Sequence, residues 1–280
     1  MNTVNSISEM QPLTREWRQA QRRVALVPTM GGLHAGQAAL IRAARAAADV
    51  VVVAAFVNPL QFSPNEVVEH YPSDPAADRQ LCEEAGADVF FAPAAAEIYP
   101  PDYSTFVTEE RLAAPLCGVS RPMHFRGVAT LTTKLLNIVQ PQVIYFGQKT
   151  AQRVAVVRKL IADLGYSVEV AVVPTEREPD GLAYGLVNRE FTAALRSQAL
   201  AVYRALTKAR AMVEAGVRSP DRLIAEATHI LGEERRLRVI YIAIVDPDTM
   251  EPLREVLPGK SLLAISAWVD EHRLVDNILL

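Results

Sequence analysis

The chain contains few cysteines and lacks a long apolar run. Only Cys82 and Cys117 are cysteines among 280 residues, and two distant thiols supply neither a disulfide framework nor a metal site. We interpret both as small core residues of a cytoplasmic protein. No apolar run approaches the roughly 20 residues that span a bilayer. The first residues also lack the pattern of a secretory signal, so we expect no membrane association and no export.

The chain also lacks a large excess of either charge. The formal net charge is −3, charged residues make up 22%, and half of the residues are apolar. This balance excludes a nucleic-acid-binding protein with a strongly basic face. The length suits one large domain or two smaller ones. Two isolated histidines, His229 and His272, are interpreted as surface residues without a role.

The first half alternates between strand and helix patterns. After a short helix within residues 1–23, β-type runs are expected at 24–27, 49–57, 87–93, 143–147 and 167–175. Helices are expected between them, at 37–48, 74–86, 127–139 and 151–164. The segment 97–127 reads as irregular. This alternation predicts an α/β fold with a doubly wound parallel sheet of the Rossmann type.

From residue 176 the pattern changes. A loop over 176–191 precedes two amphipathic helices, at 192–215 and 219–232. Three strands then follow at 238–246, 262–269 and 274–280, without long helices between them. This is an α+β pattern. We therefore predict two domains, 1–175 and 176–280, the second being the smaller.

The stretch from Val24 to Gln37 joins a strand, a glycine turn and a helix. The β-type run is followed by Gly31 and Gly32, and then by His34 at the start of the helical pattern. Backbone N–H groups at a glycine turn and a helix N-terminus attract anions. The stretch therefore predicts an anion site in which the turn amides are free and the histidine is a further donor.

Polar loops follow three of the expected strands. TMGGLH, NPLQF and GQKTAQR each begin where a β-type run ends. Because the carboxyl ends of parallel strands meet at one crevice, we expect Asn58, Gln61, Lys149 and Gln152 to face the same cleft as His34. The simpler alternative is that Asn58-Pro59 and Gly147-Gln148 only form turns. We would favour it for a single polar loop, but three such loops at successive strand ends favour a functional cleft. A lysine after a strand and a glycine is well placed to neutralise phosphate.

The segment SRPMHFRG carries three basic groups, Arg121, His124 and Arg126. A charged surface loop and an ordered wall of the cleft explain it equally well at this point.

Six motifs together carry a family resemblance. PTMGGLHAG, FVNPLQF, RPMHFRGVAT, YFGQKTAQ, REPDGLA and VDNILL resemble the pantothenate synthetase (pantoate–β-alanine ligase) family, in order and spacing, over about residues 20 to 280. The resemblance implies a nucleotidyltransferase fold related to class I aminoacyl-tRNA synthetases, with a C-terminal lid domain and a homodimer. It also implies the use of ATP and Mg²⁺ to form pantoyl adenylate, which the amine of β-alanine attacks with release of AMP.

The resemblance also implies roles for individual residues. The catalytic residues are His34 and Lys149. The nucleotide-binding positions are Met30, Gly31, His34, Gly36, Gln37, Gly147 and Lys149. The positions that bind the acid are Met30, Asn58, Gln61, Gln152, Arg153, Arg121 and His124. No metal ligand is certain; Asp78 is the one candidate for contact with Mg²⁺. Tyr71 matches a position near the site.

Several positions depart from the family pattern. The second histidine of the family's HxGH signature is Gln37, and its GEKD is Gly147-Gln148-Lys149-Thr150, without the two acids. Arg153 stands where a second glutamine contacts pantoate. The Ser-Ser-Arg of the lid loop is Gly185-Leu186-Val187. Lost donors to a transition state cost about 10²-fold or more each, so Gln37, Thr150 and the altered lid weaken the expectation of ATP use.

Two hypotheses follow. The first is an ATP-dependent ligase that joins a small acid, pantoate or an analogue, to an amine, β-alanine or an analogue. The second is a diverged paralogue that has lost adenylation and uses the cleft for another reaction on a related acid or amide, or for binding. We take the first as the main interpretation. The expected partners are small molecules and a second copy of the chain, with no nucleic acid and no membrane.

Overall fold

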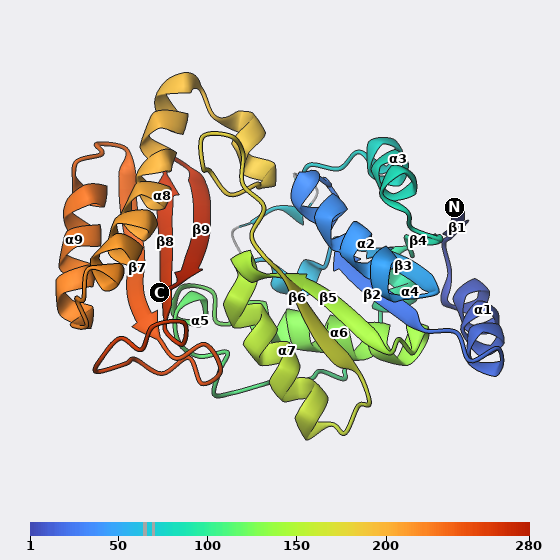
Figure 1. The fold of residues 1–280 in the computed structure, drawn as a ribbon. Helices are drawn as coiled ribbons and strands as arrows, with labels where there is room; N and C mark the ends of the chain where they lie inside the picture. Colours follow the sequence, from blue (N-terminus) through green and yellow to red (C-terminus); the bar gives the residue numbers. More distant parts are fainter. Residues whose placement is uncertain (64–65, 69–70) are drawn as a thin grey trace.

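The larger of two β-sheets contains six parallel strands. The computed structural model describes residues 1–63, 66–68 and 71–280. The sheet runs in the order β1-β4-β3-β2-β5-β6, and every neighbouring pair is parallel (Figure 1). Its strands are β1 (Asn2–Val4), β2 (Val24–Thr29), β3 (Val50–Ala55), β4 (Val89–Phe91), β5 (Val143–Gly147) and β6 (Glu169–Val173). The predicted α/β fold with a parallel sheet is confirmed.

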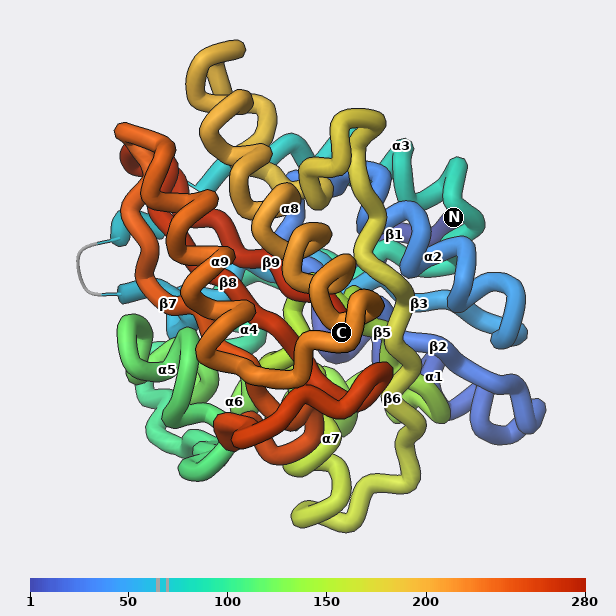
Figure 2. Tube along the Cα trace, turned by 60° about the vertical axis from the view of Figure 1, so that its left-hand side comes forward, coloured from blue at the N-terminus to red at the C-terminus, as the bar shows by residue number. Residues whose placement is uncertain are grey.

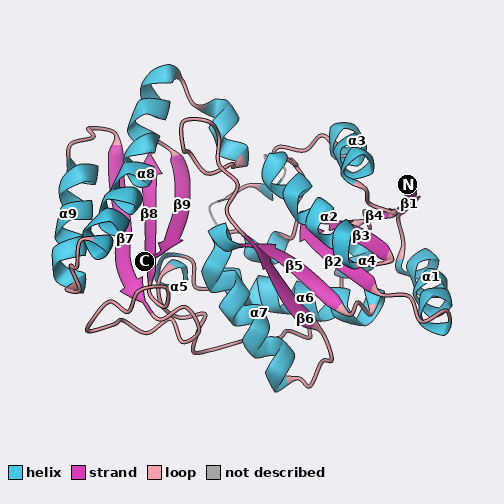
Figure 3. Ribbon diagram, in the orientation of Figure 1, coloured by secondary structure: helices cyan, strands magenta, loops and turns pink. Residues whose placement is uncertain are grey.

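Helices cover both faces of this sheet (Figure 3). Leu26 of β2 belongs to the core shared with α1 (Ile7–Gln19), α6 (His124–Val139) and α7 (Ala151–Asp163). Its neighbour Val27 belongs to the core shared with α2 (Ala35–Ala47) and α3 (Pro75–Ala85). Successive residues of a strand point to opposite faces. A strand buried on both faces is therefore apolar throughout, as β2 and β3 are.

The remaining chain forms a second sheet with its own core. Strands β7 (Leu237–Val245), β8 (Leu262–Val269) and β9 (His272–Leu279) are antiparallel in sequence order. Helices α8 (Ala193–Glu214) and α9 (Pro220–Gly232) pack on this sheet, and Figure 2 shows them lying side by side. The predicted α+β pattern is confirmed. The parallel sheet ends at Val173 and the second sheet begins at Leu237; a domain boundary at residue 175 stays a prediction.

Two details of the first half differ from the expectation. Strand β1 was not predicted; it pairs with β4 at the edge of the sheet, and a run of three residues is too short to show a period. Helix α6 begins at His124, three residues before the expected start, so His124 opens a helix. The chain also contains short helical segments. These are α4 (Ala95–Ile98), α5 (Cys117–Ser120), and the 3₁₀ turns η1 (Pro59–Gln61), η3 (Gln148–Thr150) and η4 (Leu186–Glu190).

The order of strands reverses at β2. The chain goes from β2 to β3 and β4 on one side, and later to β5 and β6 on the other side. The loops that follow β2 and β5 therefore leave the sheet in opposite directions. In open α/β sheets the crevice at such a point binds ligands. Within the described residues, no helix combines the length and the apolar character needed to cross a membrane.

Candidate active site

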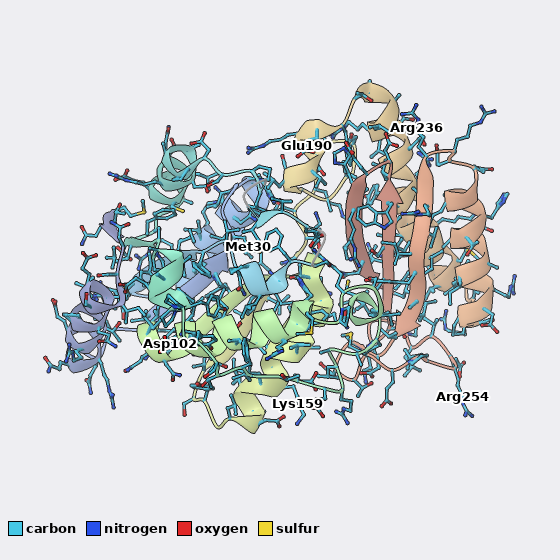
Figure 4. All side chains as sticks on the ribbon, turned by 180° about the vertical axis from the view of Figure 1, so that it is seen from behind. Met30, Asp102, Lys159, Glu190, Arg236 and Arg254 are labelled. Carbon is cyan, nitrogen blue, oxygen red and sulfur yellow. The ribbon has the colours of Figure 1, made fainter. Side chains whose placement is uncertain are left out.

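The crevice at the carboxyl ends of β2 and β5 is a cleft with an empty volume of about 1070 Å³. We call it the main cleft. Met30, which lies near the middle of the molecule in Figure 4, lines it directly after β2. Its other walls come from the β2–α2 turn, the β5–α7 junction and the segment after β6. These contribute, among others, Gly31, Gly32, His34, Gly36, Gln37, Tyr71, Gly147, Lys149, Thr150, Arg153, Glu176, Tyr184, Gly185 and Leu186.

A second cavity, of about 850 Å³, lies between the parallel sheet's helices and the second sheet. Its polar lining includes Cys117, Arg121, His124, Gln152, Tyr241, Arg273 and Asn277. Three residues line both spaces: Lys149, Thr150 and Arg153. The start of α7 therefore forms the partition between the main cleft and the second cavity.

The amides of the glycine turn are already bonded within the protein. Gly31 N–H donates to Thr29 Oγ1 over 3.2 Å. Gly32 and Leu33 donate to the two carboxylate oxygens of Asp78, over 2.9 and 2.6 Å. The prediction that these N–H groups are free to bind an anion is therefore wrong. A carboxylate from α3, not a ligand, satisfies the turn.

Asp78 is buried, and both of its oxygens accept hydrogen bonds from the turn. Carboxylates that accept backbone N–H groups in this way fix a loop. Asp78 is not among the residues that line the main cleft. Within the described chain, no cluster of three or more His, Cys, Asp or Glu side chains could hold a metal ion. The contacts of Asp78 thus favour a structural role over metal binding.

His34 is the N-cap of α2 and forms a capping box with Gln37. His34 Nδ1 accepts from Gly36 N–H over 3.1 Å, and Gln37 Oε1 accepts from His34 N–H over 3.1 Å. Burial, and then the cations Lys149 and Arg189, lower the pKa of His34 to about 4. The ring is therefore neutral at pH 7, with its proton on Nε2. His34 can donate a hydrogen bond but carries no charge.

Lys149 lies across the main cleft from this histidine's turn and reaches the segment after β6. Its Nζ donates to the carbonyl of Tyr184 over 2.6 Å, and the Tyr184 ring stacks on His34 at 5.9 Å. A Cβ on Gly185 would lie 2.8 Å from this Nζ, so glycine permits the contact. Burial lowers the pKa of Lys149 to about 8, which nearby Asp276 partly opposes.

The altered lid positions lie against the glycine turn. A Cβ on Gly32 would lie 2.8 Å from Leu186 Cδ1, so Leu186 packs directly on the turn. Arg189 Nη2 donates to the Leu33 carbonyl over 3.0 Å. Sequence reasoning missed Arg189. The family resemblance expects an arginine at position 187, which is Val187 here. The only sequence signal for Arg189 was that it lies two residues after this position.

Asn58 does not face either cavity. It is fully buried, its Nδ2 donates to the Gly127 carbonyl over 2.9 Å, and its Oδ1 accepts from Leu60 N–H over 3.2 Å. A Cβ on Gly127 would lie 2.5 Å from the Leu60 carbonyl, so η1 and α6 pack closely here. The expected place of Asn58 at the cleft is therefore corrected: it fixes the turn that carries Gln61.

Gln152 lines the second cavity, but its amide is saturated by the backbone. Oε1 accepts from Cys117 N–H over 3.1 Å, and Nε2 donates to the carbonyls of Leu112 and Pro115 over 3.0 and 2.6 Å. These contacts hold the segment before α6 in place. They leave little capacity for a substrate.

Gln61 lines neither cavity, so the expectation that it faces the main cleft is corrected; it contacts His124 and Arg153, which do line the cavities. His124 Nδ1 donates to the Gln61 carbonyl over 3.1 Å. Burial, and then the Arg153 charge, lower the pKa of His124 to about 3, so the ring is neutral. Arg153 Nη2 lies 3.5 Å from Gln61 Oε1. Nearby Arg121 forms an ion pair with Glu66. The segment around His124 is thus an ordered wall, which decides the alternative left open above.

The C-terminal strand contributes groups that the sequence did not single out. Asn277 Nδ2 donates to the carbonyls of Gln148 and Lys149, each over 3.0 Å. Asp276 forms a two-point ion pair with Arg177, at 2.6 and 3.0 Å. The Asn277 contacts tie β9 to the β5–α7 junction, and the Asp276 pair ties it to the segment after β6. No local pattern could reveal them, because the partners lie about 100 residues or more apart.

Two expectations about isolated residues need correction. Cys82 is buried as predicted, whereas Cys117 lines the second cavity, 3.2 Å from the Tyr241 hydroxyl. His272 is largely buried and lies 3.2 Å from Glu190, so it is not a surface residue. The His229 side chain is exposed, as expected.

Comparison with known proteins decides the family. A sequence profile described as pantoate-beta-alanine ligase matches residues 2–279. A pantothenate synthetase of Thermotoga neapolitana is 46% identical over 280 residues, which cover all of both chains. The chain belongs to the pantoate–beta-alanine ligase family. A pantothenate synthetase 1 of Bradyrhizobium diazoefficiens is 45% identical, over all of this chain and 98% of that one.

Solved structures agree with the family assignment. Pantothenate synthetase from Thermus thermophilus superposes with a TM-score of 0.92 at 40% identity, over 100% and 99% of the two chains. A pantoate-beta-alanine ligase from Francisella tularensis, complexed with beta-gamma ATP and beta-alanine, gives 0.77 at 27% identity, over 100% and 97%. The family's fold therefore extends over the whole chain, and its members are C–N bond-forming ligases that use ATP.

Proposed function

We propose that this chain is a ligase that uses ATP to join a small carboxylic acid to an amine through an acyl adenylate. The acid is pantoate or an analogue, and the amine is β-alanine or an analogue. One observation carries the proposal: His34 and Lys149, from the loops after β2 and β5, line a single cleft at the point where strand order reverses. The names of the relatives support it.

Adenylation makes a poor acyl donor reactive, because the carboxylate becomes a mixed anhydride with AMP as leaving group. The acid's carboxylate oxygen attacks the α-phosphorus and pyrophosphate leaves. The protein contributes mainly position and charge stabilisation. Lys149 supplies positive charge at the phosphates, and His34 donates from Nε2 without adding charge. Gly36 and Gly147 leave room for the nucleotide on either side of these groups.

The second step is attack by the amine on the acyl carbon, which releases AMP. The start of α7 lines both cavities. An acid bound at Arg153 and Gln61 therefore lies between the nucleotide and the second cavity. We infer that the amine approaches from the second cavity. Its carboxylate, if it has one, meets Arg121 and Arg273 there.

The donor set fits a Mg²⁺ ion that arrives on the nucleotide and does not fit a resident metal. Mg²⁺ commonly keeps several waters and binds one or two carboxylates together with substrate phosphates. Of the described residues that line the main cleft, Glu176 is the only carboxylate. Glu176 would hold the ion, which would neutralise charge on the phosphates.

A second candidate function rests on the lid. Leu186 packs on Gly32, and Gly185 offers no hydroxyl. The nucleotide side thus presents apolar surface where phosphate donors are expected. In this alternative the chain has lost adenylation and binds or converts a related acid or amide in the same cleft.

Two measurements distinguish the ligase from the alternative that has lost adenylation. The first is isothermal titration with ATP and Mg²⁺, and the second is pyrophosphate release with pantoate and a panel of small acids. The ligase proposal expects saturable binding, and pyrophosphate release that requires an acid. Absence of both with every acid would establish the alternative. A Lys159→Met variant is a matched control, because this lysine is on α7 but forms a surface pair with Asp163.

We further propose a homodimer in the cytoplasm, with a domain boundary near residue 175. Sedimentation equilibrium tests the dimer: a monomer at enzyme concentrations well above those of the assay would rule it out. Limited proteolysis that cuts first within 174–192 would support the boundary.

A further inference from the structure

The partition between the two cavities contains a cation, Arg153, that forms no ion pair with any other described residue. Its Nε is closed to solvent and has no hydrogen-bond partner in the described chain. A guanidinium has five N–H donors. Among the described residues, its one side-chain hydrogen bond is the 3.5 Å approach to Gln61 Oε1, which is longer than an ordinary hydrogen bond.

The described groups around Arg153 do not supply an anionic partner. Tyr71, Cys117 and Arg121 are the groups close enough to influence it. Burial raises the pKa of Tyr71, so its hydroxyl is neutral near pH 7. Arg121 is a cation already paired with Glu66. His124 is neutral, because burial and Arg153 itself lower its pKa to about 3. The site therefore places an uncompensated charge among neutral and positive neighbours.

Burying a charge is costly unless it is paired and hydrogen-bonded. Burial lowers the pKa of Arg153, as expected for a desolvated cation, yet a guanidinium stays protonated in proteins. The unsatisfied donors of Arg153 line both cavities. An anion on a ligand that reaches the partition would satisfy these donors.

The backbone adds to this positive site. Arg153 belongs to the first turn of α7, and that helix has no side-chain cap at Thr150. The N-terminus of a 13-residue helix carries positive potential. Thr150, the N-cap of this helix, and Lys149 line the same two cavities as Arg153. The carboxylate that attacks the α-phosphorus loses its charge in the acyl adenylate, so this group alone does not pair with Arg153 through both steps.

We propose that the acid substrate carries a second anionic group, a carboxylate or a phosphate ester, which pairs with the guanidinium of Arg153. The planar fork of arginine matches both groups through two parallel N–H···O bonds. This inference rests on the proposed function for the first carboxylate, which is the one activated. The second group identifies the substrate class as a small dianionic acid.

The test measures binding without ATP, so that it does not depend on adenylation. Titration calorimetry compares pairs of acids whose main carbon chains have the same length, one acid with one anionic group and the other with two. The carboxylate arm uses butyrate against succinate and pantoate against malate; the phosphate arm uses glycerate against 3-phosphoglycerate. We expect at least one dianion to bind tenfold or more tightly than its partner. The arm in which this occurs identifies the anionic group.

Arg153→Gln and Arg158→Gln are the matched variants. Both remove an arginine from α7, but Arg158 is half-exposed and lies 3.7 Å from Asp248. Arg153→Gln should abolish the preference for the dianion, and Arg158→Gln should keep it. The inference is overturned if no dianion exceeds its monoanionic partner in the wild-type protein, a comparison that needs no variant. It is also overturned if a folded Arg153→Gln protein retains the preference.

The outcomes for the two proposals are distinguishable. Tight binding of a dianion without pyrophosphate release in the presence of ATP and Mg²⁺ would support Arg153 as the acid site and contradict the ligase. Pyrophosphate release with pantoate alone, unchanged in Arg153→Gln, would support the ligase and contradict the second anionic group.

Discussion

The two walls of the main cleft use their hydrogen-bond donors in opposite ways. In the β2–α2 wall, Asp78 and Thr29 occupy the amides of the turn, and Gln37 completes a capping box with His34. In the β5–α7 wall, Lys149 is held only by a carbonyl, and Arg153 Nε has no partner in the described chain. Positive charge for a ligand therefore comes mainly from the β5–α7 wall. The β2–α2 wall supplies shape and a neutral imidazole.

Of the changes that test the difference between the two walls, replacement of Lys149 by Met should have the largest effect. It removes the ammonium from the phosphate side and leaves the histidine wall intact. We expect the rate of pyrophosphate release to fall about 10²- to 10³-fold. Lys159→Met, the surface control on the same helix, should retain the wild-type rate. A loss smaller than about tenfold would place the main phosphate contact elsewhere.

Replacement of Asp78 by Asn should show that the β2–α2 wall is built by internal hydrogen bonds. One amide of the turn loses its acceptor, and the other loses a charged one. Hydrogen bonds to charged groups contribute about 1.5–3 kcal/mol each, so we expect the free energy of unfolding to fall by about 2–3 kcal/mol. Urea denaturation measures this change. Asp163→Asn, at an exposed ion pair, should change it by less than about 0.5 kcal/mol, and equal effects would contradict our account.

The two walls should also differ in their response to pH. Lys149 has a pKa of about 8, because burial disfavours its charged form, whereas His34 has one of about 4. Between these values Lys149 is charged and His34 is neutral. Above about pH 8 the affinity for ATP–Mg²⁺ should fall, approaching tenfold per pH unit. Titration calorimetry over about pH 6.5–9.5 measures it, and Lys149→Arg should give a nearly flat profile, since arginine stays protonated.

Stability should change in the opposite direction over the same range. The folded-state pKa of Lys149, about 8, is lower than its ordinary value of 10.5. The charged form is thus penalised in the folded state, and this penalty is relieved as pH rises from about 8 to 10.5. If affinity and this stability contribution fell together, Lys149 would not be the titrating group.

The smallest expected effect comes from Gly185→Ser, which adds a donor to the lid. Its Cβ would lie 2.8 Å from Lys149 Nζ, so the lysine must move away from the Tyr184 carbonyl. A released ammonium and a new hydroxyl should tighten ATP binding about fivefold, the value of one net hydrogen bond. Gly232→Ser, where a Cβ meets open space, is the control. Unchanged or weaker binding would show that the lid does not contribute to the phosphate site.

Sequence patterns predicted correctly that His34 and Lys149 line one cleft, and failed for other residues for a common reason. Lys149 was found because a basic residue after a buried strand has to leave the sheet at its carboxyl end. Asn58 and Gln152 follow the same logic, yet backbone groups of Gly127 and Cys117 consume their amides. A polar residue at a strand end is equally suited to bind a ligand or to bind the protein.

The sequence by itself determined the parallel sheet, the second α+β unit and the place of the cleft, because hydrophobic periodicity and strand ends are local features of the chain. Only the tertiary structure decided which donors remain available there. Asp78 reaches Gly32 across 46 positions, and Asn277 reaches Lys149 across 128. Whether a buried polar group forms its hydrogen bonds depends on such distant partners. A donor that is bonded within the protein is not available to a ligand. That is why the glycine turn is closed to anions while Arg153, which no distant carboxylate in the described chain reaches, still lacks one.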